Sequence, residues 1–252
     1  LREICVRLTS GHTPLRHDLS VGDVLFLTVE CVSPLTIRSD LAKRVLREHL
    51  VGELARVAIQ EDSVLITIKR RICQATPCYG ITVPAVVNQD IAVAQLREGW
   101  KPGYVAAYLV SRPGQALADR ERTEQMNPYL PVGLLGNLLI PKLSANGQTE
   151  VDDLVRAKRQ ADLDADRLYS KAEKSLSKHL RLDTIPVGYA RQYSTTYRSV
   201  VRASRVDAQH FRPEFDQLEH LMRSVVGDTS VLPLQQLVTF NQRGKQPVYV
   251  EG

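Results

Sequence analysis

Hydrophobic and polar positions follow different periods in two parts of the chain. Up to about residue 148, short apolar and β-branched runs are bounded by turn-forming residues, which is the pattern of strands. After residue 150, apolar residues recur every three or four positions and Gly and Pro are absent up to residue 181, which is typical of a helix. The predicted strands cover residues 24–29, 64–68, and the run from 81–83 through 91–93.

Two short helices are predicted among these strands. Ser39 or Asp40 can cap a helix over residues 41–50, and Pro102 precedes a second helix over 104–110. A mixture of strands and short helices in about 148 residues predicts one compact α+β domain with a mixed β-sheet.

The longest predicted element is a helix over residues 150–181. Acidic residues begin it and basic residues end it, which suits the helix dipole. Its apolar seam either packs against a partner helix, as in a coiled coil, or lies on its own domain, because about three heptads are compatible with both. The seam consists of Val151, Leu154, Lys158, Ala161, Ala165, Leu168, Ala172 and Leu176.

These patterns divide the chain into four segments. Residues 1–148 form the α+β domain and 149–182 the long, coiled-coil-like helix. Residues 183–230 form a linker and a further helix over 214–226, which follows a proline. Residues 231–252 contain an apolar, strand-like stretch and a polar turn, which indicate the start of a second unit. The chain does not begin with Met and ends abruptly, so we expect a fragment of a longer protein.

Composition excludes several classes of protein. The chain has 33 Lys and Arg against 28 Asp and Glu, and the net charge of +5 permits a nucleic-acid partner without requiring one. Of the 33 cationic residues, 24 are Arg, whose guanidinium binds phosphate and guanine through two hydrogen bonds. No apolar run is long enough for a membrane helix, and the N-terminus lacks a signal-peptide layout. Four cysteines fit a reducing compartment, so we predict a cytoplasmic protein without a membrane partner.

Motifs for catalysis and metal binding are incomplete. Cys73 and Cys78 lack both the tighter spacing and the second pair of a zinc knuckle. Gly244 and Lys245 lack the remainder of a phosphate-binding loop. Residues 127–129, Asn-Pro-Tyr, lack the second proline of a loop that holds a flipped adenine, so a turn is favoured. We therefore predict no catalytic residue and no metal ligand in this chain.

A short pattern occurs near both ends of the chain: an apolar strand, a polar residue, Gly, two further residues and Pro. Further motifs lie between the two copies. In chain order, the motifs are Ser-Gly-His-Thr-Pro at 10–14, 87–91, 107–111, 138–141 before the long helix, 205–208 with 211–215, and 243–250. Together they resemble the target recognition domain and spacer helix of specificity subunits of Type I restriction–modification enzymes.

The resemblance implies a component that reads double-stranded DNA. Such subunits use two recognition domains, each reading half of a bipartite target, and paired spacer helices set the distance between them. A methylation subunit supplies S-adenosylmethionine and a motor–nuclease subunit hydrolyses ATP, so no cofactor is expected on this chain. Residues 69–71, Lys-Arg-Arg, replace the family's usual glycine-containing turn, and the helix that precedes the first domain is missing. A truncated subunit is the simplest account.

Three polar loops are the candidate DNA contacts, because Arg and polar side chains on loops suit base edges and phosphates. Each could instead be an ordinary solvated loop. Two other functions stay open: the specificity portion of a fused methyltransferase–endonuclease, and a coiled-coil interaction protein without DNA binding. The candidate residues are Ser10, Gly11, His12 and Thr13 in the first loop, Lys69, Arg70 and Arg71 in the second, and Arg120, Arg122, Gln125 and Asn127 in the third.

Overall fold

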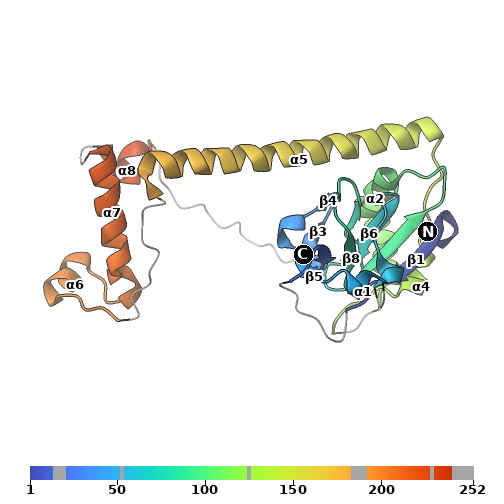
Figure 1. Cartoon of the computed structure of the whole chain (residues 1–252), viewed down its shortest axis with the longest axis horizontal. Helices are drawn as coiled ribbons and strands as arrows, with labels where there is room; N and C mark the ends of the chain where they lie inside the picture. Colours follow the sequence, from blue (N-terminus) through green and yellow to red (C-terminus); the bar gives the residue numbers. More distant parts are fainter. Residues whose placement is uncertain (14–20, 52–53, 124–125, 183–191, 228–229, 240–252) are drawn as a thin grey trace, which may run out of the picture. The chain divides into compact units, whose positions relative to one another are not determined.

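The computed structural model divides the chain into two compact units, Leu1–Asp164 and Ala165–Gly252. The first unit contains β-sheets and short helices, so its fold class is α+β as predicted (Figure 1). Within the described part of the chain, no helix is both long and apolar enough to cross a membrane. The structure describes residues 1–13, 21–51, 54–123, 126–182, 192–227 and 230–239.

The first unit is built on a four-stranded sheet with strand order β1-β9-β6-β7, in which every pair is antiparallel. β6 is buried at every position and β9 at all but one, as expected for central strands covered on both faces. The strands are β1 (Cys5–Ser10), β6 (Ser63–Thr67), β7 (Ala75–Pro77) and β9 (Ile91–Leu96).

A smaller sheet has strand order β5-β2-β8, with β2 antiparallel to β5 and parallel to β8. A two-residue pair, β3 and β4, forms a third sheet. β8 is followed directly by β9, so the turn between them links the two larger sheets. The strands are β2 (Val24–Leu27), β3 (Val32–Ser33), β4 (Thr36–Ile37), β5 (Lys43–Val45) and β8 (Ala85–Val87).

Two buried clusters lie on opposite faces of the main sheet, because successive strand residues point to opposite sides. Ile66 of β6 and Ala92 of β9 belong to the cluster beneath helix α2, whereas Leu65 and Val93 belong to the cluster shared with the small sheet. The helices of this unit are α1 (Glu48–Val51), α2 (Pro102–Val110), α3 (Arg112–Glu121) and α4 (Val132–Gly136), with 3-10 turns at Arg2–Ile4, Val29–Cys31, Ser39–Leu41 and Ala55–Val57.

Helix α5 (Ala145–Leu180) confirms the predicted long helix and begins five residues before it. Its buried residues are Gln148, Asp152 and Val155. At 3.6 residues per turn, this line lies roughly 120° around the helix from the middle of the predicted seam. The buried contact of the helix with the first unit is therefore centred away from the seam, although the seam residues Val151 and Lys158 touch the unit at its edge, Val151 by packing on the core and Lys158 by a hydrogen bond to Thr36. The seam residues Leu154, Leu168 and Leu176 are 66%, 61% and 56% exposed.

The second unit contains short helices around α7 (Pro213–Val226), which confirms the helix predicted after a proline. Residues Leu234–Leu237 form helix α8, so the strand expected in this stretch is wrong up to residue 237. The polar turn at 243–247 and the linker at 183–191 lie outside the described residues. The remaining elements are α6 (Tyr197–Ala203) and a 3-10 turn, Ala208–Phe211.

Two predictions for the first unit are corrected. The helix over 41–50 is wrong up to residue 47 and confirmed only at its end, within α1. β5 occupies its centre and pairs with β2, so tertiary pairing overrides local helix propensity there. The strand at 81–83 is also wrong. Pro84 lacks the N–H that a strand ladder needs, and pairing with β2 begins one residue later, at Ala85. Helix α2 confirms the helix predicted over 104–110.

Candidate nucleic-acid interface

The predicted loops meet at one end of the main sheet. β1 ends where β9 begins, because Ser10 pairs with Ala92. β6 ends at the same level, where Thr67 pairs with Ile91. The loops that follow β1 and β6, and the turn that precedes β9, therefore leave the sheet at the same end.

The first loop is held by its backbone. The N–H of Gly11 donates to the carbonyl of Ile91 at 2.8 Å, and that of His12 donates to the carbonyl of Val87 at 3.1 Å. Gly11 is buried, and a Cβ atom there would lie 2.0 Å from the carbonyl oxygen of Asn88. Gly11 thus provides close packing between two backbones and presents no side chain to a ligand.

The first loop contacts the turn between β8 and β9 through the side chain of Thr13. Ser10, His12 and Thr13 are half-buried. The hydroxyl of Thr13 donates to the side-chain oxygen of Gln89, which is exposed. A hydroxyl and an amide, both suited to hydrogen bonding with bases or phosphates, are thereby brought together, and His12 of the same loop adds a half-buried imidazole.

The second loop carries two cations with acidic neighbours. The Nζ atom of Lys69 lies 3.4 Å from the carboxylate of Asp90 and 5.3 Å from the ring centroid of Tyr129. Arg70 lies 3.0 Å from the carboxylate of Glu30, and both side chains are more than half exposed. An ion pair as exposed as that of Arg70 contributes about 0–1 kcal/mol, so Arg70 can exchange its partner for a phosphate at little cost. Lys69 is held more firmly, because the side chain of Asp90 is only 12% exposed.

The third cation of this loop has a structural contact. Nη2 of Arg71 donates to the backbone carbonyls of Val29 and Val32 at 2.9 and 3.3 Å. The hydroxyl of Thr67 donates to the carbonyl of Arg71 itself. Arg71 thus joins the loop after β6 to the 3-10 turn after β2, and this contact occupies one of its two terminal nitrogens.

A hollow of about 590 Å³ joins the second and third loops. Thr123 closes the third loop by donating its backbone N–H to the carbonyl of Tyr129 at 2.9 Å. Tyr129 also forms a β-bridge with Lys69, and Asn127 is exposed at the rim. The lining residues are Lys69, Arg70, Asp90, Asn127, Pro128 and Tyr129.

The other candidates of the third loop lie at the end of α3 and beyond it. Arg120 is paired with Glu121 at 3.1 Å and Arg122 with Asp119 at 3.2 Å, and both arginines are exposed. Neither lines the hollow. Gln125 lies outside the described residues.

The turn Asn88–Asp90 was missing from the candidate residues, although its sequence lies within a motif of the resemblance. It touches the first loop through Gln89 and the second through Asp90. Tyr129, whose ring lies against Lys69, was also missed. An Asn-Gln-Asp run between two apolar strands is a turn signal, and it could have added this segment to the candidates.

A buried polar contact fixes helix α5 to the domain. One oxygen of Asp152 accepts the N–H of Gly103 at 2.7 Å and the hydroxyl of Tyr79. The other oxygen accepts Nε of Arg156 at 2.8 Å, and that guanidinium lies 3.7 Å from the centroid of the Tyr79 ring. Burial, together with Asp152, raises the pKa of Tyr79. We call this group, Tyr79, Gly103, Asp152 and Arg156, the helix anchor.

The fold and the loops define an α+β domain whose sheet ends in a polar, partly cationic surface, with a long helix anchored elsewhere on the domain. Its chemistry suits phosphates and base edges. Within the described ranges, no cluster of three or more His, Cys, Asp or Glu is arranged to hold a metal ion.

Comparisons with known proteins place this architecture beside two solved structures. One comes from work on complex assembly and conformational transition of the type I R-M system; it has 13% identity and a TM-score of 0.45, with 70% of this chain and 41% of that chain covered. The other is the HsdS subunit from Thermoanaerobacter tengcongensis, with 10% identity, a TM-score of 0.32, and 63% and 38% covered. The chain thus spans less than half the length of either. No family model and no curated protein matches it.

Proposed function

We propose that the protein recognises double-stranded DNA as the specificity component of a Type I restriction–modification complex. The observation that carries the proposal is the gathering of separate polar loops at one end of the main sheet, around a hollow lined by Lys69, Arg70 and Asn127. Lys and Arg bind phosphate, whereas Arg and Asn side chains also pair with guanine and adenine edges.

The turn Asn88–Asp90 connects the first and second loops of this surface. Gln89 hydrogen-bonds with Thr13 of the first loop, and Asp90 pairs with Lys69 of the second. The proposed DNA contacts are therefore Ser10, His12 and Thr13, with Gln89 added, together with Lys69, Arg70 and Asn127. Arg120, Arg122 and Gln125 stay predicted contacts at its periphery. Gly11 and Arg71 act by shaping the loops.

Helix α5 is proposed to be the spacer. It has 36 residues and would span roughly 54 Å at 1.5 Å per residue. The helix anchor fixes its first part to the recognition domain, and Leu154, Leu168 and Leu176 of the seam stay exposed and available to a partner. We propose that the seam pairs with a second helix, as in a coiled coil. Residues 1–148 would read DNA and 149–182 would set the spacing, while 183–230 would lead to a second unit at 231–252.

The partners proposed for this cytoplasmic chain follow from its motifs. A methylation subunit would bring S-adenosylmethionine, and a motor–nuclease subunit would bring ATP hydrolysis, so catalysis would belong to the partners. These subunits could be separate chains or parts of one fused methyltransferase–endonuclease, and the neighbouring genes would distinguish the two arrangements.

The proposal is tested by selecting bound duplexes from a random pool, with the methylation subunit present, and titrating the selected sequence at two salt concentrations. Affinity should fall with salt at a log–log slope of about −0.9 per neutralised phosphate. The double variant Lys69→Gln, Arg70→Gln should bind more weakly and flatten this slope by about two. Arg112→Gln, which removes one positive charge at the exposed start of α3, is the control for the loss of a surface charge outside the hollow.

No enrichment by a folded wild-type preparation with the methylation subunit present would contradict DNA recognition. If the protein then still paired with another helix through the seam, the coiled-coil interaction protein would be the better account. Equal losses in the double variant and in Arg112→Gln would mean that the hollow is not the contact surface.

A further inference from the structure

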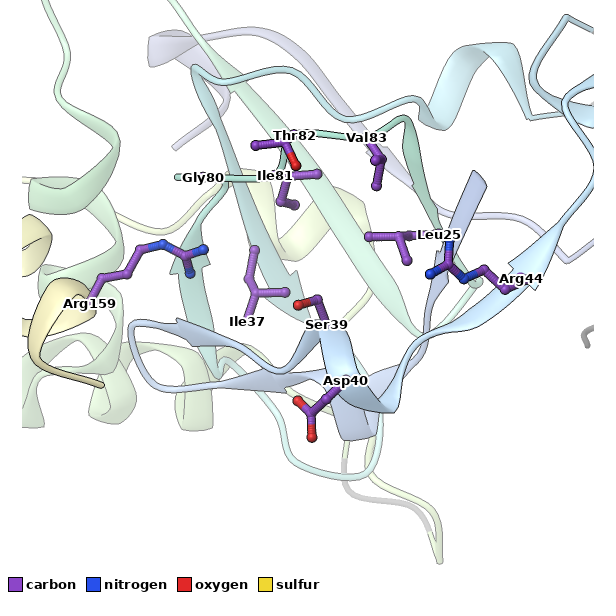
Figure 2. A pocket seen from close by; sticks show the side chains of 10 residues that line it. All are labelled: Leu25, Ile37, Ser39, Asp40, Arg44, Gly80, Ile81, Thr82, Val83 and Arg159. Carbon is purple, nitrogen blue, oxygen red and sulfur yellow. The ribbon is translucent and has the colours of Figure 1, made fainter. Parts of the chain in front are cut away.

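A second hollow, of about 330 Å³, lies where helix α5 passes the small sheet. Figure 2 shows two arginines on opposite sides of it, Arg159 from α5 and Arg44 from β5, with their guanidinium groups turned toward one another. Leu25 and Ile37 lie between them. Both belong to a buried cluster of the core, so the hollow has cationic sides and an apolar floor.

The two guanidinium groups are available to a ligand. In the described part of the chain, neither Arg44 nor Arg159 makes a hydrogen bond or an ion pair with another residue. Arg159 lies closely over Gly80, where a Cβ atom would be 2.8 Å from its Nη2 atom. Gly80 has φ +67°, a conformation that favours glycine, and it leaves room for the guanidinium at the mouth of the hollow.

The carboxylates near the hollow are already compensated. Asp40, which lines it, accepts two hydrogen bonds from Arg38 at 2.9 and 2.7 Å. Asp162, one turn along α5 from Arg159, accepts a hydrogen bond from Lys158 at 2.7 Å. The charges of Arg44 and Arg159 are therefore the ones that an anion entering the hollow would meet.

The hollow does not belong to the candidate DNA surface. Residues 80–83, which form part of its wall, precede β8, whereas the turn Asn88–Asp90 follows β8. The two sites thus lie toward opposite ends of this strand. In β2, Leu25 pairs with Ala85 at the start of β8, which places the floor of the hollow at the end away from the DNA loops.

We propose that this hollow binds a small organic oxyanion, a carboxylate or a phosphate monoester carried on an apolar body. The charges of both guanidinium groups attract such an anion, either group can bind it through charge-assisted hydrogen bonds, and the apolar floor between them accommodates the body. The volume lies at the lower end of the range for small-molecule sites. Because Arg159 belongs to α5 and Arg44 to the sheet, a bound anion strengthens the contact of the helix with the domain.

The probes are benzoate, phenyl phosphate and inorganic phosphate, with benzyl alcohol as the neutral analogue, each titrated into the whole chain by calorimetry. At least one of the two aromatic anions should bind and raise the melting temperature, more strongly than benzyl alcohol. Arg44→Gln and Arg159→Gln should each weaken binding about tenfold, as expected for the loss of a charge-assisted hydrogen bond. The Lys69→Gln, Arg70→Gln variant is the charge control and should bind the probe like the wild type.

The probe that binds more tightly identifies the chemical class of the ligand. Tighter binding of benzoate indicates a carboxylate, and tighter binding of phenyl phosphate indicates a phosphate monoester. Absence of binding by either aromatic anion, or equal binding of benzyl alcohol, would overturn the proposal. So would loss of DNA affinity in Arg44→Gln or Arg159→Gln comparable to that in the loop variant, because the hollow would then be part of the DNA surface. Arg159→Lys keeps the positive charge but loses the planar pair of N–H donors of the guanidinium. This variant checks that a loss of anion affinity reflects recognition of the anion and not a folding defect.

Discussion

The loop end of the main sheet and the helix anchor use similar residue types in opposite ways. At the loop end, Arg70 and Glu30 form an ion pair with exposed fractions of 68% and 56%. In the anchor, the side chain of Asp152 is only 4% exposed and accepts hydrogen bonds from three donors. Water screens both sides of the first contact and reaches only the Arg156 side of the second, so the charge of Arg70 is exchangeable whereas that of Asp152 is fixed.

The largest expected effect is at the anchor. Asp152→Ala leaves the Gly103 N–H, the Tyr79 hydroxyl and the Arg156 guanidinium without their common acceptor. We expect the free energy of unfolding to fall by about 2–3 kcal/mol, because two buried donors lose a charged acceptor whereas Arg156, 48% exposed, stays solvated. Urea unfolding measures it. Asp153→Ala, at the exposed neighbouring position, should change stability by less than about 0.5 kcal/mol. A similar effect of both substitutions would contradict the anchor.

Gly11→Ala tests the backbone at the loop end. A Cβ atom 2.0 Å from the carbonyl oxygen of Asn88 forces the two segments apart. Overpacking of this kind costs about 1–3 kcal/mol. Thermal unfolding gives the loss, and Gly133→Ala, where a Cβ atom meets nothing within 4 Å, is the matched control. If the first variant were as stable as the second, the close approach would carry no energetic weight.

Tyr79→Phe removes the hydrogen bond that the hydroxyl donates to Asp152 and the one that it accepts from the Gly103 N–H, and should cost about 1–2 kcal/mol at neutral pH. The pKa of Tyr79 is raised in the folded chain, chiefly by burial and then by Asp152. Its contribution is therefore fully present below the unfolded-state pKa of about 10 and declines as pH rises above that value. Unfolding free energies measured across this range should decline less steeply in Tyr79→Phe. Identical slopes would refute the assignment.

The smallest effect on stability is expected at the exposed cation. Arg70→Gln should change the free energy of unfolding by less than about 0.5 kcal/mol, because its ion pair with Glu30 is solvated. Under the proposed function it should still weaken DNA binding measurably. A variant that loses stability and DNA affinity together would mean that the loops, like the anchor, are part of the folded framework.

Local sequence patterns were sufficient to predict the secondary structure of elements that depend mainly on their own residues. The three-to-four spacing predicted helix α5, and Pro102 placed the start of α2. The sequence pattern was insufficient where pairing with a distant strand determines the secondary structure. The residues of β5 are compatible with a helix, but they form a strand because they pair with β2. The sequence predicted the seam as a line along one face of a helix. It did not predict which face of the helix is buried against the domain, because that face is set by the contacts of Gln148, Asp152 and Val155.

The candidate site likewise contains residues that local sequence patterns predict and residues that only the fold brings together. Ser10, Lys69 and Asn127 were selected as polar residues on loops, and the strand register brings their loops together. Asp152 was interpreted only as an acid suited to the start of a helix. Its buried partner, Tyr79, lies 73 residues earlier in the chain, and no local pattern connects the two. Contacts over this separation require the fold.

Under the proposed function, the turn Asn88–Asp90 has a consequence for how recognition of a new DNA sequence would arise. Because Gln89 contacts Thr13 and Asp90 contacts Lys69, a substitution in one loop changes the surroundings of another. Effects of substitutions on either side of the turn should be non-additive, as they are for residues in direct contact. Specificity would then be inherited as a set of matched loops, and single-loop exchanges would be epistatic.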